Sequence, residues 1–324
     1  MESYANKTCQ GRWMSEDYKP GLVSVCLCTY KRPTLLAKCL QSLLDQNINR
    51  CFEVVLVDND ADKIAAEVAE TFAKRFSNSG SKLQYDVEPQ QNIALARNKA
   101  VAMASGQYIA FIDDDEEAEK DWLEKLCGTL EREGADGVFG PVIRVFPKTF
   151  PECLVKSNLF REPRMRRTGS RIAGLEGRTG NILVKRAVLT KRKGPFEKHL
   201  RRTGGSDTEL FYWLEKQGSQ FCWCNEAVVR EHIDNNRATL TWHFRRGYRS
   251  GWLMAMIATH TMGRTLGSVY TLFHVFLGFV KSIVLFFLNL RCPTVAILMF
   301  GGKIGGQLGQ CGFLLGIRIE EYKG

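Results

Sequence analysis

The sequence predicts an α/β fold in which helices cover a mostly parallel sheet. Between residues 22 and 112, short apolar runs alternate with segments that carry apolar side chains at helical spacing. This alternation is typical of parallel sheets, because a crossover helix must connect each strand to the next. Polar or acidic residues follow three of the apolar runs, and ligands bind at such strand ends in sheets of this kind.

The predicted strands of the first half are the apolar runs at residues 22–28, 52–57, 83–87 and 108–112. Helices are expected between them, at residues 33–45, 64–76 and 93–104. Pro33 suits a first helical turn, since its missing N–H would have no partner there. In the second helix Ile64, Val68, Phe72 and Phe76 stand four residues apart, which predicts one buried face.

The second half predicts a helix at residues 122–132, strands at 137–143, 177–184 and 227–232, and a helix from 206 to a stop at Gly218. Residues 147–175 are rich in proline and arginine, and a structureless stretch of this length is usually a functional lid or disordered. Cys222 and Cys224 have no second pair at zinc-binding spacing, so we expect them to be strand residues.

Charge is distributed unevenly along the 324 residues, whose net charge is +10. Residues 1–140 carry 16 Lys and Arg against 23 Asp and Glu, a net charge of −7, whereas residues 141–324 carry 29 against 12, a net charge of +17. A basic second half indicates a polyanion or an anionic membrane surface as partner.

The eleven cysteines are scattered, and many lie within apolar runs, as Cys26, Cys39 and Cys127 do. This pattern favours buried free thiols in a reducing compartment. Residues 1–20 form a polar leader without the apolar run of a signal peptide, so we expect the catalytic part to stay in the cytoplasm.

Three consecutive aspartates, Asp113, Asp114 and Asp115, end the predicted strand at 108–112. Carboxylates this close repel one another and raise each other's pKa unless a cation lies among them. Oxygen ligands at a strand end suit Mg²⁺ or Mn²⁺, particularly when phosphate oxygens complete the coordination. The alternative is a solvated acidic turn that caps the helix starting near Asp121.

Asp207 is a candidate general base. Ser206 and Glu209 have the spacing of a capping box, which predicts that Asp207 lies in the first turn of a helix, behind two glycines. The helix dipole favours its ionised form there, as a base requires. Alternatively, Asp207 is simply an acid at a helix start.

His232, at a predicted strand end, is either a metal ligand or an ordinary surface or core histidine.

Residues 269–290 are mostly apolar and long enough to cross a membrane. Lys281 near their middle would cost about 2.5–3.5 kcal/mol on insertion. Gly278 and the break at residues 291–293 also weaken a span, so a helix lying in the membrane interface or a shallow hairpin is expected. The alternative is a set of ordinary core helices.

The preceding residues 241–249 mix arginine with aromatic side chains, which could bind nucleic acid, a diphosphate or lipid headgroups.

Taken in order, these segments resemble the family 2 glycosyltransferases, which have the GT-A fold. The resemblance covers roughly residues 22–235 and rests on segments 23–33, 55–60, 91–98, 109–116 and 204–210, with Gly180-Asn181 as a further, glycine-containing match. It implies a leader at 1–20, a catalytic domain at 21–240 and a membrane-associating region at 241–324. The Gln-x-x-Arg-Trp motif of processive synthases is absent, which favours the addition of one sugar per binding event.

The resemblance implies roles for individual residues. Mg²⁺ or Mn²⁺ would be held by Asp115 and His232, with Asp113 acting through water, and Asp207 would be the base. The donor would contact nine residues: Cys28, Thr29, Tyr30, Arg32, Asp58, Asn92, Arg97, Asp114 and Asn181.

The expected reaction is transfer with inversion from a nucleotide sugar, such as a UDP-sugar, to an acceptor hydroxyl. Because Arg161–Arg171 and Arg245–Arg249 suit a diphosphate, the acceptor is expected to be a polyprenyl-diphosphate-linked saccharide for a bacterial surface polysaccharide, at the cytoplasmic face of the inner membrane. Two alternatives are a basic protein that binds nucleic acid through residues 147–203 and 230–249, and a metal-dependent nucleotidyltransferase. The first leaves the acidic strand ends unexplained, and the second does not need Asp207.

Overall fold

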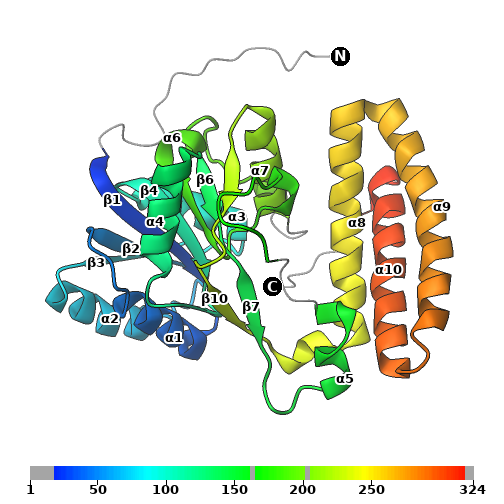
Figure 1. Ribbon diagram of the computed structural model, residues 1–324, viewed down its shortest axis with the longest axis horizontal. Helices are drawn as coiled ribbons and strands as arrows, with labels where there is room; N and C mark the ends of the chain where they lie inside the picture. The colour runs from blue at the N-terminus through cyan, green and yellow to red at the C-terminus, as the bar shows by residue number, and fades with distance from the viewer. Residues whose placement is uncertain (1–17, 161–164, 201–204, 318–324) are drawn as a thin grey trace.

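A seven-stranded, mostly parallel sheet forms the centre of the computed structural model, which describes residues 18–160, 165–200 and 205–317 (Figure 1). The polar leader therefore lies almost entirely outside the described residues. The strand order is β3-β2-β1-β4-β8-β6-β9, and β8 runs antiparallel to both of its neighbours. The α/β prediction is confirmed. The strands are β1 (Lys19–Thr29), β2 (Phe52–Asp58), β3 (Lys82–Val87), β4 (Gly106–Asp113), β6 (Gly137–Phe139), β8 (Ile182–Lys185) and β9 (Phe221–Trp223).

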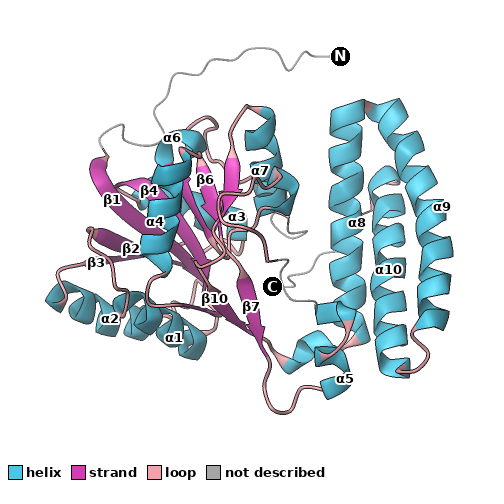
Figure 2. Cartoon of the chain, viewed as in Figure 1, coloured by secondary structure: helices cyan, strands magenta, loops and turns pink. Residues whose placement is uncertain are grey.

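Helices cover both faces of this sheet, as Figure 2 shows. On one face α1 (Pro33–Leu44), α2 (Ala66–Asn78) and α4 (Trp122–Glu133) pack Leu36, Phe76 and Leu126 against alternate strand residues. On the other face α3 (Ile93–Met103), α6 (Arg186–Leu189) and α7 (Ser206–Lys216) pack with a second core cluster. Because strand side chains alternate between the faces, strands buried on both sides are continuously apolar, which is why they were visible in the sequence.

A second, three-stranded sheet with the order β5-β10-β7 was not predicted. It is formed by β5 (Glu116–Ala118), β7 (Val142–Val145) and β10 (Val229–His232). Its central strand β10 is antiparallel to β5 and parallel to β7. Since β5 begins two residues after Asp114, this small sheet directs the chain that follows the acidic triplet.

The segment between β7 and β8 is partly ordered, contrary to the expectation of a long structureless stretch. It contains α5 (Glu152–Val155) and the 3₁₀ helices η1 (Asn158–Phe160) and η2 (Gly174–Glu176). Residues 161–164, with the predicted Arg161, lie outside the described residues. Arg166 pairs with Glu176, and Arg171 donates a hydrogen bond to Gln220 at 2.6 Å, so these two arginines are engaged within the protein. The remaining short helices are η3 (Lys198–Leu200) and η4 (Asn235–Ala238).

The rest of the described chain is a bundle of three long helices beside the α/β domain that contains the two sheets (Figure 1). These are α8 (Leu240–Met262), α9 (Arg264–Leu288) and α10 (Pro293–Leu314). The predicted apolar helix begins at Arg264 rather than at 269, and the predicted break at 291–293 precedes α10. Gly263 alone joins α8 to α9, with a φ of 79° that favours glycine.

Glycines bring the backbones of α8 and α10 into direct contact. A Cβ atom on Gly251 would lie 1.9 Å from the carbonyl oxygen of Gly306, and one on Gly309 would lie 1.9 Å from that of Tyr248. Interfaces built from small residues at four-residue spacing are typical of helices that associate in membranes, where close van der Waals contact replaces the hydrophobic effect.

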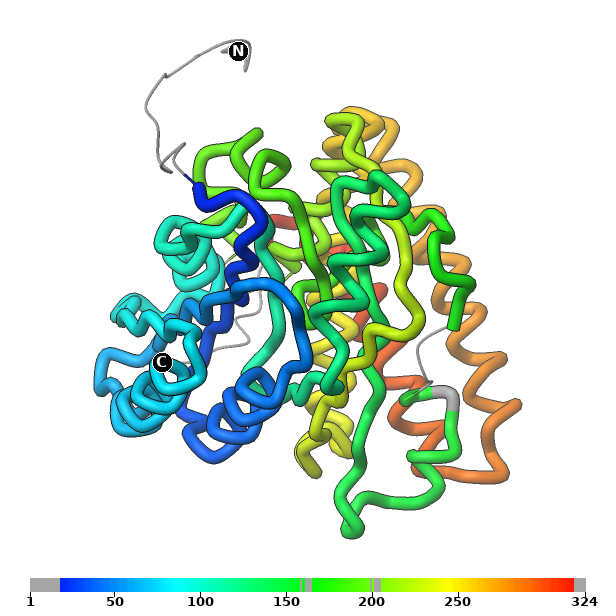
Figure 3. Tube along the Cα trace, turned by 60° about the vertical axis from the view of Figure 1, so that its left-hand side comes forward, coloured from blue at the N-terminus to red at the C-terminus, as the bar shows by residue number. Residues whose placement is uncertain are grey.

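The bundle contacts the α/β domain near both ends of α8. Figure 3 shows the bundle and the domain from a second direction. Near its beginning, Trp242 and His243 pack against Phe160, with ring centroids 6.4 Å and 5.6 Å apart. Near its end, the hydroxyls of Thr261 and Tyr212 are 2.8 Å apart. The 23-residue helix, about 34 Å long, therefore lies along the side of the α/β domain.

Candidate active site

The acidic triplet lies at the end of β4, near the ends of β1 and β2. The parallel register pairs Thr29 with Asp58 across β1 and β2, and Cys28 with Asp113 across β1 and β4. Since the carboxyl ends of these three strands coincide, the polar residues that follow each of them gather at one edge of the sheet. This part of the predicted donor site is thus assembled by strand register.

Asp114 is held by the β1 end. Its carboxylate accepts a hydrogen bond from the Thr29 hydroxyl at 2.7 Å and one from Arg32 at 3.4 Å, and the backbone N–H of Tyr30 also donates to it. Burial raises the pKa of Asp114, an effect that Arg32 and Thr29 oppose. The side chain fixes the turn after β1, so Thr29, Tyr30 and Arg32 are brought to Asp114 as the predicted site requires.

Asp115 lies between two arginines, with its carboxylate 3.0 Å from Arg32 and 3.4 Å from Arg237. Burial raises its pKa to about 7, with further contributions from the charges of Asp113 and Asp114. The two guanidinium groups therefore compensate this carboxylate incompletely. A buried carboxylate of raised pKa among other acids is the environment that a bound cation would relieve.

Glu116 is a further acidic residue of the site that the sequence did not single out. Its side chain is buried and accepts a hydrogen bond from the backbone N–H of Asp113 at 2.9 Å. Burial and the neighbouring Asp113 raise its pKa well above the usual range. A Cβ on Gly180 would lie 2.5 Å from its Oε1, so the absence of a side chain at Gly180 makes room for this carboxyl group. The Glu116 side chain points inward because β5 pairs with β10, and sequence patterns do not predict that pairing.

The β2 end has a different arrangement from the predicted one. Asp58 accepts hydrogen bonds from the backbone of Asp60 and Ala65 and from the Tyr85 hydroxyl at 3.2 Å, so it braces the loop after β2. Asp60 is buried, and its Oδ2 has no hydrogen-bond partner among the described residues. The hydrogen bonds of Asp58 therefore go to the protein, whereas among the described residues Asp60 keeps one carboxylate oxygen available for a ligand.

Asn92 caps α3 by accepting a hydrogen bond from the backbone of Ala94 at 3.0 Å, and its own N–H donates to the Asn59 side chain at 2.9 Å. It therefore joins the β2 loop to the helix that carries Arg97. Arg97 donates to Asp113 at 3.3 Å, and the charges of Asp113 and Asp207 raise its pKa against the opposing effect of burial. This guanidinium thus connects the acidic triplet with the candidate base.

Asp207 lies in the first turn of α7, as predicted, but the predicted capping box is wrong. Gly205 is the N-cap, with a φ of 86° that favours glycine, and Ser206 is the first helical residue. The Ser206 hydroxyl is buried without a partner among the described residues, and Glu209 forms an ion pair with Arg192 at 2.8 Å. Asp207 is half-buried and keeps the helix-start position that a carboxylate favours.

His232 is placed beside Asp115 by backbone pairing, since its N–H donates to the Asp115 carbonyl at 2.9 Å. Its imidazole Nε2, however, is 2.6 Å from the Glu117 carboxylate. In the described part of the chain, no three His, Cys, Asp or Glu side chains are arranged to hold a metal ion by themselves. The predicted ligands Asp113, Asp115 and His232 are neighbours but not a preformed cage.

Two other predicted donor contacts have specific environments. The Cys28 thiol is half-buried, and burial raises its pKa to about 12, so it stays neutral. The Asn181 amide accepts from Trp122 at 2.8 Å and donates to the carbonyls of Pro141 and Ala227. Because its hydrogen bonds go to the protein, Asn181 positions the strands around the site. Its predicted contact with the donor stays a prediction.

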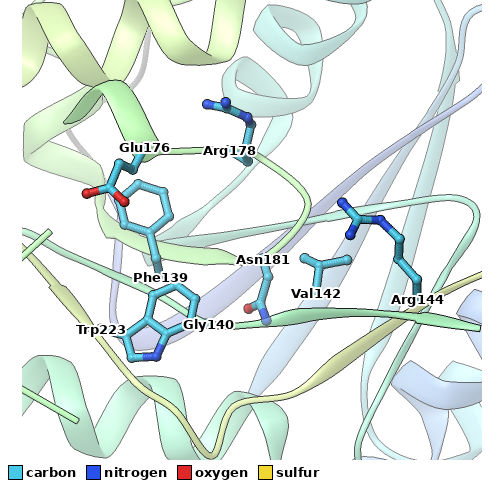
Figure 4. Close-up of a pocket in the computed structure, with 8 residues that line it drawn as sticks. All are labelled: Phe139, Gly140, Val142, Arg144, Glu176, Arg178, Asn181 and Trp223. Atoms are coloured by element: carbon cyan, nitrogen blue, oxygen red, sulfur yellow. The ribbon is translucent and has the colours of Figure 1, made fainter. Parts of the chain in front are cut away.

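A cavity of about 180 Å³ lies beside Asn181 (Figure 4). Arg144 and Arg178 extend on the same side of it, above Asn181 in this view. Arg178 also donates to the Thr208 hydroxyl at 2.8 Å, next to Asp207. The other lining residues are Phe139, Gly140, Val142, Glu176 and Trp223.

Residues 24–190 match the protein family described as Glycosyl transferase family 2. The chain is a member of this family. Over 231 residues it is 31% identical to the succinoglycan biosynthesis protein ExoM of Rhizobium meliloti, covering 71% of this chain and 72% of that protein. A glucosyl-dolichyl phosphate glucuronosyltransferase of Haloferax volcanii is 26% identical over 250 residues, covering 71% and 75%. The protein is therefore an enzyme, a glycosyltransferase. The comparisons do not support the nucleic-acid-binding and nucleotidyltransferase alternatives.

Solved structures of S. aureus TarS have the same fold. The complex with UDP-GlcNAc superposes with a TM-score of 0.52 at 14% identity, covering 91% of this chain and 92% of that one. The complex with UDP superposes with a TM-score of 0.51. These similarities confirm the GT-A fold expected from the resemblance.

Proposed function

We propose that this glycosyltransferase moves one sugar from a UDP-sugar to an acceptor hydroxyl with inversion of the anomeric centre. The observation that carries the proposal is the position of Arg97, which donates to Asp113 at 3.3 Å and is within range of the charge of the helix-start carboxylate of Asp207. The acidic triplet with Asp113 suits a phosphate-bound cation, and Asp207 suits a base. Support for a UDP-sugar comes from the TarS structures, whose ligands are UDP and UDP-GlcNAc.

The residues present fit a divalent cation. The donor set is oxygen-rich, and the raised pKa of Asp115 marks a carboxylate whose charge is incompletely compensated. Asp115 and Asp113 would hold Mg²⁺ or Mn²⁺, with His232 after its imidazole leaves Glu117. The cation would neutralise charge on the leaving nucleoside diphosphate. Because the described residues include no preformed cage, phosphate oxygens of the donor would complete the coordination, as is common for Mg²⁺.

The chain's own groups account for the rest of the reaction. The acceptor oxygen forms its bond to the anomeric carbon while the bond from that carbon to the diphosphate breaks, and Asp207 takes the hydroxyl proton. Arg97 and Arg32 hold Asp113, Asp114 and Asp115 in place through their ion pairs. A single displacement from the opposite face inverts the centre, so an α-linked donor gives a β-linked product.

A panel of nucleotide sugars tests this function. With Mn²⁺ the full chain is expected to hydrolyse one UDP-sugar slowly in the absence of acceptor, and chelation by EDTA should abolish the release of UDP. Proton NMR of the transferred sugar should show the inverted anomeric configuration. Retention of configuration, or turnover that is unaffected by chelation, would contradict the proposal.

Support for membrane association comes from the surface and charge of the bundle. Of the described helices, α9 is the one long and apolar enough to cross a membrane, yet it is mostly exposed. Phe276 and Phe287 keep 66% and 63% of their surface exposed. Residues 235–317 contain eight Lys and Arg and no Asp or Glu. Apolar surface with exclusively basic charge suits an anionic membrane, whereas a second copy of the chain would bring like charges together.

The attachment of α8 favours an in-plane position of α9 over a span. Because Phe160 and Tyr212 of the catalytic domain contact α8 near its two ends, the catalytic domain lies beside the bundle along most of its length. If α9 crossed the bilayer along its axis, this charged domain would have to enter the hydrocarbon. We therefore place the enzyme on the cytoplasmic face of the inner membrane, with the outer face of α9 in the interface.

This position favours a lipid-linked acceptor. The relative in Haloferax volcanii is described as acting on glucosyl-dolichyl phosphate, and ExoM as acting in succinoglycan biosynthesis. A saccharide linked to polyprenyl diphosphate presents its anion beside apolar lipid, which matches the basic and apolar character of the bundle. We propose this class of acceptor, in the synthesis of a bacterial surface polysaccharide.

Replacing Phe276 and Phe287 together with glutamate should release the protein from membranes. Two phenylalanines contribute about 3–6 kcal/mol of apolar burial, so vesicle affinity is expected to fall roughly a hundredfold or more. Flotation with vesicles containing phosphatidylglycerol measures the effect. Ile64→Glu, at an exposed apolar residue of the catalytic domain, is the matched control. Flotation of the double variant at the wild-type level would refute the in-plane assignment.

A further inference from the structure

Four arginines gather where the small sheet meets α8: Arg144 of β7, Arg237 of η4, and Arg246 and Arg249 of α8. The charges of the other three arginines all lower the pKa of Arg246. Trp242 connects part of this arginine cluster, since the guanidinium carbons of Arg237 and Arg246 lie 5.7 Å and 5.0 Å from its ring centroid. Cation–π contacts of this kind hold the guanidinium planes in fixed directions.

Among the described residues, two acidic side chains pair with members of this cluster. Glu231 is 2.5 Å from Arg237 and 3.9 Å from Arg144, and Asp115 is 3.4 Å from Arg237. The guanidinium of Arg246 forms no hydrogen bond or ion pair with any residue that the structure describes, and lies on Trp242 instead. Crowding by protein, together with Arg249 and Arg237, lowers its pKa to about 10 against the opposing effect of Glu231, yet the residue stays exposed.

A bound anion would offset the mutual repulsion of these guanidinium groups. The cluster contacts Asp115 through Arg237, and Arg32, which follows β1, contacts the same carboxylate. The cluster therefore borders the reaction centre and the bundle at once. Arg144 also lines the cavity beside Asn181, which extends the basic surface toward Arg178 and α7.

We infer that the arginine cluster, with Trp242, is a binding site for a diphosphate group. Planar guanidinium groups bind two phosphate oxygens at once, and several of them share the charge of a diphosphate. The position between Asp115 and the basic, apolar bundle favours the diphosphate of the lipid-linked acceptor over that of the nucleotide donor. This assignment of the source rests on the proposed function, whereas the presence of an anion site does not.

Titration calorimetry with geranyl diphosphate and with geraniol, which lacks the anion, tests the site in the full chain. Geranyl diphosphate is expected to bind protein already saturated with UDP and Mg²⁺, and geraniol far more weakly. Arg246→Gln should lower the affinity for geranyl diphosphate about 10- to 100-fold, because a charge-assisted contact is lost, and leave UDP affinity unchanged. Arg246→Lys should recover part of the loss.

Arg245 was grouped with Arg246 and Arg249 on sequence alone, but it is exposed and does not lie on Trp242, so we leave it out of the cluster. Arg245→Gln, on the same helix, is therefore the matched control. If geranyl diphosphate competes with UDP and Arg246→Gln weakens both, the cluster is a diphosphate site that belongs to the donor. If Arg246→Gln changes neither affinity by more than about threefold, or acts no differently from Arg245→Gln, the inference is overturned. These binding results do not depend on turnover, so they remain decisive even if no sugar transfer is detected.

Discussion

Asp115→Ala is expected to reduce sugar transfer roughly a thousandfold or more, because a catalytic cation contributes several kcal/mol to charge stabilisation on the leaving group. The side chain is buried at the edge where β1, β2 and β4 end, and its pKa is raised to about 7. The Mn²⁺-dependent part of UDP binding should disappear in the variant. Calorimetry with and without Mn²⁺, together with initial rates of transfer, measures both effects.

The same variant should fold, and it should become more stable at high pH. Burial and the charges of Asp113 and Asp114 raise the folded-state pKa of Asp115 above its usual value, so the folded protein binds the proton more tightly than the unfolded chain. The wild type therefore loses folding stability as the pH rises from the usual pKa of an aspartate toward 7, and the loss is complete above pH 7. At pH 8 without metal, Asp115→Ala should therefore melt at a higher temperature than the wild type, and Mn²⁺ should stabilise the wild type alone.

Glu119→Ala is the control for Asp115→Ala within the same acidic segment. Glu119 is exposed and pairs with Arg230 at 2.7 Å, outside the site. Its loss is expected to change transfer by less than about threefold, as for most exposed ion pairs. Full activity of Asp115→Ala, or an equal loss in Glu119→Ala, would exclude the assigned role of Asp115.

Local patterns were sufficient to predict the central sheet and its covering helices. The strands β1, β2 and β4 are apolar on both faces, and α2 carries Phe72 and Phe76 at helical spacing, so these elements are visible one at a time. Parallel strands then place Cys28, Asp58 and Asp113 at one edge without further information. The small sheet was missed because β5 is three residues long and acidic, and pairs only with the distant β10.

The side-chain arrangement of the site depended on contacts between distant segments. The spacing of Ser206 and Glu209 suggested mutual capping, but Gly205 turns the chain through a positive φ and Arg192 attracts Glu209 instead. Arg237 reaches Asp115 across 122 residues of sequence. The glycines of α10 were visible, but their contact with α8 appears only when both helices are placed.

Asp207→Asn is expected to lower kcat about 10²- to 10⁴-fold, the usual effect of removing a general base. Asparagine keeps the size of the side chain at the start of α7, so the fold and UDP-sugar binding should be preserved. Glu209→Gln is the control that separates a general base from an ordinary acid at a helix start. It removes the other acid of the same helical turn and its ion pair with Arg192. We expect kcat of this variant to stay within about threefold of the wild type. If Asp207→Asn loses less than about threefold, or Glu209→Gln loses as much, the proton must be taken by another group and Asp207 contributes only to the helix.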